Sequence, residues 1–325
     1  MNKYIRTDLA MEIGEKYKED NVEIEGVEIK EMHNDKGTIK TTVVNIFNDK
    51  GAMAMGREKG KYITIENLGV YDSYKYDEEE LIMAISKELR GLIKSLFEGR
   101  ECQNKNITKI KTKDITKNKD KQSDKYIHRK LNVENILVVG LGNIEITPDA
   151  LGPNVVNMID VSRYILTEKG IAALAPGVMG QTGLEVSEIV KALVKEINIE
   201  LVIVIDALAA RSVYRLNNTI QLTNTGIAPG SGVGNNRKEI SNKSVGVPVI
   251  AVGIPTVVDA YSIVNDIVER FLVREGCKES EINEFLEKMR KENIENMFVT
   301  SKVVDVHVKK SSEIVAKGIN LALNK

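Results

Sequence analysis

The first third of the chain alternates apolar and polar residues over short stretches that glycines separate. The alternation runs through residues 22–30, and residues 38–47 and 61–66 are rich in β-branched and aromatic side chains. A period of two with such residues is typical of half-buried strands. The pattern therefore predicts strands joined by hairpins in this part.

A helical pattern follows the last of these strands. Apolar residues recur at helical spacing from Leu81 to Leu96, Asp77 with Glu80 three residues later forms a start signal, and Gly99 is a stop signal. We therefore expect one amphipathic helix between Asp77 and Gly99.

From residue 131 onward, short continuous apolar runs alternate with helical patterns. The predicted buried strands are residues 135–139, 200–205 and 247–253, and the predicted helices are 153–169, 183–196, 259–274, 280–296 and a C-terminal one through Ile314 and Leu321. Residues 303–308 fit either a strand or a helix. Strands that are buried on both sides and separated by helices predict the α/β class, with a central, mostly parallel twisted sheet and helices on both faces.

The composition narrows the function classes. The 325 residues include 46 Lys+Arg and 47 Asp+Glu, giving a net charge of −1, with 42% hydrophobic residues and no Trp. This composition is that of a globular protein, and aromatic side chains for stacking on nucleic-acid bases are scarce, so direct nucleic-acid binding is not expected. No apolar run reaches the roughly 18 residues of a membrane span, so we expect a cytoplasmic protein. Cys102 and Cys277 lie far apart and form no metal or redox motif.

Residues 103–130 differ from the rest of the chain because they carry ten Lys and Arg residues and only three Asp residues. A net charge of +7 over this stretch predicts a solvated basic insertion or linker. A role in attracting an acidic partner is the alternative interpretation.

Two aspartates follow predicted strands at the sheet edge where α/β proteins bind ligands. In the segment after the first strand, Thr147 is expected to cap a helix, Pro148 to fit its first position and Asp149 to lie in its first turn, which favours the ionised carboxylate and a general base. Asp206 ends a predicted apolar strand, where burial favours the protonated form and a general acid. Such a pair suits hydrolysis, and helix capping is the structural alternative for Asp149.

Other motifs are less informative. Gly140 and Gly142 begin a dinucleotide-binding pattern, but its third glycine is replaced by Glu145, and the glycine-rich residues 230–234 lack the Lys-Ser/Thr ending of a phosphate loop. The three histidines, at positions 33, 128 and 307, lie outside the α/β pattern, so a serine triad or a histidine-ligated metal is not indicated there.

Several long strings of the sequence resemble a known family. They occur in one order along nearly the whole chain apart from the basic insertion, and they are IRTDLA at 5–10, GLGN at 140–143, TPDALGP at 147–153, APGVMGQTG at 175–183, DALAAR at 206–211, TNTGIAPGSGVGNNR at 223–237 and VGIPTVVDA at 252–260. These strings closely resemble those of the spore germination protease family.

The resemblance implies an endopeptidase that degrades small acid-soluble spore proteins when a spore germinates. It further implies a homotetramer in the forespore and spore core, a fold similar to hydrogenase-maturation endopeptidases, and no cofactor or metal. The family's catalytic acids correspond to Asp149 and Asp206, which makes the mechanism an atypical aspartic type. Which of the two carries the proton is left open.

The family is made as a zymogen, and its cleavage site has an acidic residue before a hydrophobic one and then Ala. In this chain Asp8, Leu9 and Ala10 match that site, so we expect self-processing between Asp8 and Leu9. The structural alternative is that Thr7 and Asp8 cap a helix that starts near Leu9. The domains are then a propeptide at 1–8, a β-rich part with one helix at 9–102, the basic segment at 103–130 and the α/β catalytic core at 131–325. Arg6 is a candidate for holding the zymogen inactive by pairing with an acid.

Two alternatives remain from the residues themselves. One is a metal-dependent maturation endopeptidase, which chelators would inhibit. The other is a non-catalytic α/β binding module, in which Asp149 and Asp206 affect stability more than turnover.

Overall fold

The structure is a computed structural model that describes residues 7–19, 23–68, 77–98, 133–165, 170–230, 237–290 and 297–324. The predictions for Arg6, Cys102, His128, the basic segment 103–130 and most of the glycine-rich residues 230–234 lie outside the described residues. Among the described helices, none is long and apolar enough to cross a membrane.

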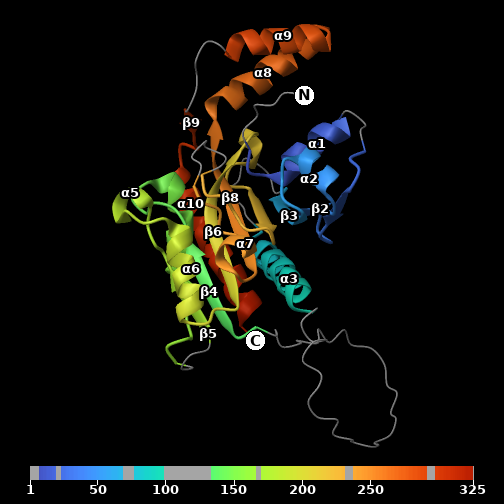
Figure 1. The fold of residues 1–325 in the computed structure, drawn as a ribbon. Coiled ribbons are helices and arrows are strands. Elements are labelled where there is room, and N and C mark those ends of the chain that lie inside the picture. The colour runs from blue at the N-terminus through green and yellow to red at the C-terminus, as the bar shows by residue number, and fades with distance from the viewer. Residues whose placement is uncertain are drawn as a thin grey trace, which may run out of the picture.

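Within these residues, nine strands form one sheet in the order β1-β2-β3-β7-β8-β6-β4-β5, with β9 paired to β8 (Figure 1). The strands are β1 Val27–His33, β2 Ile39–Ile46, β3 Gly60–Asn67, β4 Asn135–Gly140, β5 Gly170–Leu174, β6 Leu201–Ala210, β7 Thr219–Thr223, β8 Val249–Asp259 and β9 Phe298–Val299. The neighbours β5, β4, β6 and β8 are parallel, and the other pairs are antiparallel. The predicted α/β class is confirmed, and the parallel arrangement is limited to the four strands at one end of the sheet, β8, β6, β4 and β5.

Helices cover both faces of the central strands because alternate residues of each strand point to opposite sides. In β6, Ile203 and Ile205 pack in the hydrophobic cluster that includes α3, α4 and α10, whereas Val202 and Val204 pack in the cluster with α6 and α7. The bounds are α3 Glu78–Phe97, α4 Leu151–Val156, α6 Val186–Glu196, α7 Asn242–Val245 and α10 Val304–Leu323. The strongest single prediction of a helix, between Asp77 and Gly99, is confirmed by α3.

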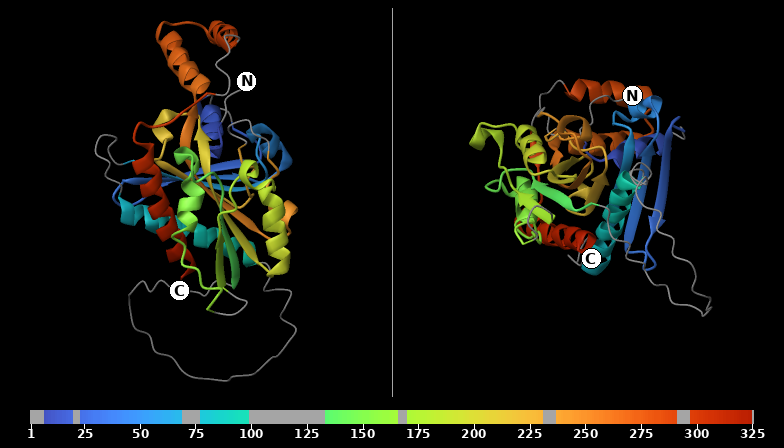
Figure 2. Two further views of the ribbon diagram at one scale, coloured as in Figure 1. Left: turned by 90° about the vertical axis from the view of Figure 1, so that its left-hand side faces the viewer. Right: turned by 60° about the horizontal axis from the view of Figure 1, so that its bottom comes forward.

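The N-terminal strands continue the same sheet. Strand β3 pairs with β7, with Ile63 opposite Leu222, and the helices α1 Ala10–Glu19 and α2 Asp49–Met55 lie beside β2 and β3 (Figure 1). The helices α8 Ala260–Arg274 and α9 Glu279–Arg290 project from the molecule (Figure 2). The remaining helix is the short α5 Met179–Thr182.

Three local predictions are corrected. The helix expected over 153–169 ends after Val156, because the chain turns back to start β5, where the N–H groups of Ser162 and Arg163 bond to Ile171 O. Strand β6 continues to Ala210 because it keeps pairing with β8, so Asp206 lies inside the strand and not at its end. Residues 303–308 begin helix α10.

Candidate active site

A cavity of 690 Å³ lies over the second half of β6 and brings together three aspartates from distant segments of the chain. Asp8, Asp149 and Asp206 all line it, together with Leu208, Ala209 and the cationic side chains of Arg237 and Lys238. The two predicted acids therefore share one cavity, and the predicted cleavage site adjoins it.

Asp206 is a buried carboxyl with few partners. By alternation with Val202 and Val204 it points to the α6 side of the sheet, it is 6% exposed, and its Oδ1 accepts one bond of 3.0 Å from its neighbour Ala207 N. Burial, then the charge of Asp149, then that of Asp8 raise the pKa of Asp206 well above its ordinary value, and the Ala207 N–H opposes them only in part. Burial and the two like charges therefore favour the protonated form of this carboxyl.

Asp149 is less buried and lies at the end of a short 3₁₀-helix, η1 Thr147–Asp149. Its Oδ2 accepts a bond of 2.7 Å from Asn143 N. The loop comes this close because Gly142 has φ +111° and its Cα approaches Asp149 O, where an added Cβ would lie at 2.0 Å. This glycine therefore allows the close approach of the loop to Asp149.

The pKa of Asp149 differs from the prediction. Burial raises this pKa, and the bond from Asn143 N opposes the rise without reversing it. The expected α-helical N-terminus is absent, since Ile146 takes the N-cap position and Thr147 makes no capping bond. The order of the two acids is nevertheless the predicted one, because Asp206 is the more strongly shifted.

Asp8 is bound to β6 through backbone and side chain. Its N–H donates to Ala209 O and its Oδ2 accepts from Ala209 N, both at 2.9 Å. The next residue, Leu9, is fully buried against Leu208 and Val258. Residues 8 and 9 thus lie against the strand that carries Asp206.

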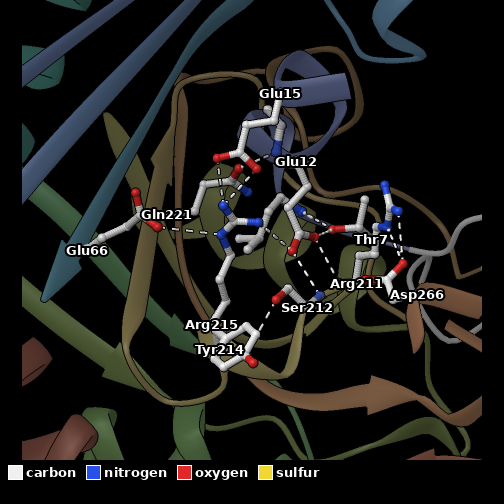
Figure 3. A network of polar contacts seen from close by, with 12 residues as sticks. Thr7, Glu12, Glu15, Glu66, Arg211, Ser212, Tyr214, Arg215, Gln221 and Asp266 are labelled. Atoms are coloured by element: carbon white, nitrogen blue, oxygen red, sulfur yellow. Dashed lines mark hydrogen bonds and ion pairs between the residues drawn. The ribbon is translucent and has the colours of Figure 1, made fainter. Parts of the chain in front are cut away.

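The start of α1 is anchored by a network of charged groups (Figure 3). Glu12, 4% exposed, accepts bonds from Arg211 N at 2.8 Å, Ser212 N at 3.1 Å and Arg215 Nη1 at 2.9 Å, and Thr7 Oγ1 also donates to it. Burial disfavours charge on Arg215, but Glu12 and Glu15 outweigh it and keep its pKa above the ordinary value. The network fixes Thr7 and α1 to the segment that follows β6.

Gln221 and the network of Glu12 and Arg215 were not predicted from the sequence. Gln221 lies in β7 among alternating polar residues and bonds to the backbone on both sides of Leu9. The only local signal for it is that alternation. Glu12 and Arg215 are 203 residues apart, so no local pattern reveals their pairing.

Within the described part of the chain, no group of three or more His, Cys, Asp or Glu side chains is arranged to hold a metal ion. His307 Nδ1 lies 3.3 Å from Asn217 Nδ2, and His33 ends β1 at the far side of the sheet from β6. Neither histidine lines the cavity of the three aspartates.

The fold and the cavity define an α/β protein with one buried and one partly buried carboxyl, whose pKa values are raised to different degrees. This arrangement is suited to acid–base hydrolysis. Comparison with known proteins identifies the family. The sequence model of the germination protease family matches residues 103–294. A germination protease of Caldanaerobacter subterraneus subsp. tengcongensis is 41% identical, over 98% of this chain and 94% of that relative. One from Priestia megaterium is 40% identical, over 84% of this chain and 68% of the relative.

The chain belongs to the germination protease family, and it is a peptide-bond hydrolase that acts as a spore germination endopeptidase. This excludes the non-catalytic binding module. Among solved structures, a [NiFe] hydrogenase maturation protease from Thermococcus kodakarensis is 12% identical with a TM-score of 0.32, covering 58% of this chain and 94% of that chain. No conclusion about function follows from a likeness of that size.

Proposed function

We propose that this chain starts the degradation of small acid-soluble spore proteins in the germinating spore, and that Asp149 and Asp206 are its catalytic pair. We further propose that it is made in the forespore as a zymogen that removes residues 1–8 by cutting between Asp8 and Leu9. The mechanism is then of an atypical aspartic type.

The observation that carries this proposal is the proximity of three aspartates that the sequence separates widely. The charges of Asp149 and Asp8 both act on Asp206, and all three residues line one cavity. A cleavage site that adjoins the carboxyl pair of its own chain is what intramolecular processing needs.

In the proposed reaction, ionised Asp149 takes a proton from water, and the water oxygen adds to the carbonyl carbon of the scissile bond. Asp206 then gives its proton to the leaving nitrogen as the carbon–nitrogen bond breaks. The more strongly raised pKa of Asp206 supports this division of roles. Because the two carboxyls interact, the two apparent pKa values seen in a titration describe the pair and not either residue alone.

Recognition of an acidic residue before the cut is supported by the contacts of Asp8. Its carboxylate accepts the Ala209 N–H, and Arg237 and Lys238 line the same cavity. Lys238 is also paired with Glu188 at 2.6 Å, whereas Arg237 Nη1 lies 2.9 Å from Met179 Sδ. Arg237 is therefore the cation that we assign to an acidic substrate side chain.

The proposal is tested by cleavage of a purified small acid-soluble spore protein by the chain that starts at Leu9. We expect the parent to cut after an acidic residue and folded Asp149→Asn and Asp206→Asn variants to be silent. Asp35→Asn, an exposed aspartate in the β1–β2 turn, is the matched control and should keep full activity. Cleavage that survives either substitution would give that acid a structural role, and insensitivity of the parent to chelators would exclude a metal-dependent reaction.

A homotetramer is the proposed assembly, and the projecting helices offer a surface for it. Ile267, Phe271 and Val273 of α8 and Phe285 of α9 are each about half exposed or more, the largest value being 60% for Ile267. Exposed apolar side chains that gather on one element are typical of subunit contacts. Ile267→Asp should reduce the molar mass measured by light scattering, and an unchanged tetramer would assign the contact to another surface.

A further inference from the structure

The side-chain amide of Gln221 spans the predicted cleavage site. Its Nε2 donates to Asp8 O at 2.9 Å, and its Oε1 accepts from Ala10 N at 2.8 Å. The donor therefore bonds to the carbonyl oxygen of the peptide bond between Asp8 and Leu9, and the acceptor bonds to the peptide unit just beyond Leu9. Gln221 is 6% exposed and appears in the same close view as the Glu12 network (Figure 3).

The sheet fixes Gln221 and Asp206 on either side of one glycine. Gly253 of β8 is in register with Asp206 of β6 and with Gln221 of β7. The neighbours of Gln221 in β7, Ile220 and Leu222, pack on the α3 side, so Gln221 points to the opposite face, the face of Asp206. Two strand spacings of about 4.8 Å separate the two backbones.

Gly253 keeps the space between these two residues open for Leu208. A Cβ at position 253 would lie 2.6 Å from the Leu208 side chain. Asp8 and Leu208 line both the cavity of the three aspartates and a neighbouring cavity of 190 Å³ that contains Gln221. The Asp8 peptide unit therefore lies between the carboxyl pair and the Gln221 amide.

We propose that Gln221 donates a hydrogen bond to the carbonyl oxygen of the scissile peptide bond, first in self-processing at Asp8–Leu9 and then in protein substrates. The inference rests on the proposed self-processing. When water adds to the Asp8 carbonyl carbon, negative charge develops on the oxygen that already accepts the Gln221 N–H. A fixed donor in a buried site stabilises that charge more than it stabilises the neutral carbonyl.

The proton balance of the step follows from this arrangement. The water proton goes to Asp149, the oxyanion is held by Gln221 Nε2, and collapse of the intermediate breaks the bond to Leu9 N, which takes the proton of Asp206. After residues 1–8 leave, Gln221 Oε1 keeps the Ala10 N–H, and its Nε2 is open to the carbonyl of a substrate.

A purely structural role for Gln221, the anchoring of α1 through Ala10, uses only the acceptor oxygen. Gln221→Glu separates the two roles because it has nearly the same shape, keeps an acceptor for Ala10 N and loses the donor. Thr223→Ser is the matched control, since Thr223 is the next residue of β7 on the same face and lines the same smaller cavity.

The experiment measures conversion of the full-length chain by mass spectrometry, together with thermal unfolding. We expect Gln221→Glu to process about 10²–10³-fold more slowly, the usual effect of losing one oxyanion donor, with a parent-like melting temperature. In chains that start at Leu9, kcat should fall with little change in KM. The ratio of variant to parent rate should rise as the pH falls, because the introduced carboxyl regains an O–H donor when it is protonated.

The outcomes separate this inference from the proposed function. If the parent does not cut between Asp8 and Leu9, the self-processing proposal fails. If the parent cuts and both aspartate variants are silent while Gln221→Glu processes at the parental rate, the catalytic pair stands and the role of Gln221 is wrong. An effect confined to KM, or equal loss of stability and rate, also overturns the donor role.

Discussion

The buried carboxyls of Glu12 and Asp206 both lie at residues 206–212, where β6 ends, and their surroundings differ completely. Asp206 begins this segment, and Glu12 binds the backbone at its end. Glu12 is 4% exposed and accepts bonds from two backbone N–H groups, a hydroxyl and the guanidinium of Arg215. Asp206 is 6% exposed, accepts one bond from its neighbour Ala207 N and is affected by the like charges of Asp149 and Asp8. The first has donors for both of its oxygens, whereas burial and like charges raise the pKa of the second.

The number of donors that a buried carboxyl receives separates structural from chemical acids in this molecule. A buried carboxylate whose oxygens accept bonds from several donors is compatible with a stable fold. Removing one partner leaves a buried charge without compensation and destabilises the fold strongly. A buried carboxyl that lacks a cation and meets other carboxyls adds nothing to stability at neutral pH, so its presence needs a different explanation. For Asp206 that explanation is the proposed chemistry.

The largest effect on stability is expected for Glu12→Gln. The variant leaves the buried Arg215 with Glu15 and the more distant Glu66, so the free energy of unfolding should fall by about 3 kcal/mol. Urea unfolding followed by circular dichroism measures it. Glu25→Gln is the control, because the Glu25 carboxylate is 69% exposed and pairs with exposed Lys50. Equal stability of the two variants would mean that the buried contacts of Glu12 contribute no more than an exposed ion pair.

The next effect concerns pH and Asp206. Its pKa in the folded chain is raised above the ordinary 3.8, so the folded state binds more protons than the unfolded state between the two values. The stability from this group is complete below the unfolded pKa and is lost as the pH rises through the folded pKa. Asp206→Asn lacks this loss, and its stability relative to the parent should rise with pH by up to about 1.4 kcal/mol per unit in that window. Unfolding of chains that start at Leu9, from pH 4 to 8, tests this, and parallel curves would mean that Asp206 is ionised in the fold.

A smaller shift is expected from the charge of Asp8, the weakest of the three causes that raise the pKa of Asp206. Asp8→Asn keeps an oxygen for the Ala209 N–H and removes only the charge. The test uses full-length chains that carry Asp149→Asn, because these are not expected to cut themselves. Adding Asp8→Asn to them should lower the pKa of Asp206, so the loss of stability with rising pH should occur at lower pH. A shift in the opposite direction would mean that Asp8 interacts with Asp206 by some means other than its charge.

The sequence predicted the parts of this site that have local signals. The apolar run before Asp206 and the Pro-Asp turn at Asp149 mark both acids, and the resemblance to germination proteases adds Asp8. The length of β6 could not be read from the sequence, because its pairing with β8 and not the composition of residues 207–210 carries the strand on. Gln221 and the pair of Glu12 with Arg215 depend on contacts between distant segments, which no spacing rule reports.

Glu66 gives the smallest expected effect and lies between the two kinds of acid. It pairs with Arg215 Nε of the network at 3.5 Å and with Lys40 Nζ at 3.8 Å. Burial raises the pKa of Glu66 more than Arg215 and Lys40 lower it, so its stabilising contribution is present below the unfolded pKa and is lost as the pH rises through the folded one. At pH 7 Glu66→Gln should therefore change the free energy of unfolding by less than about 1 kcal/mol, and toward greater stability. Urea unfolding at pH 7 measures the change. If Glu66→Gln lowered the free energy of unfolding as much as Glu12→Gln, membership of the network would determine what each acid contributes to stability. The number of donors that each carboxylate receives would then not determine it.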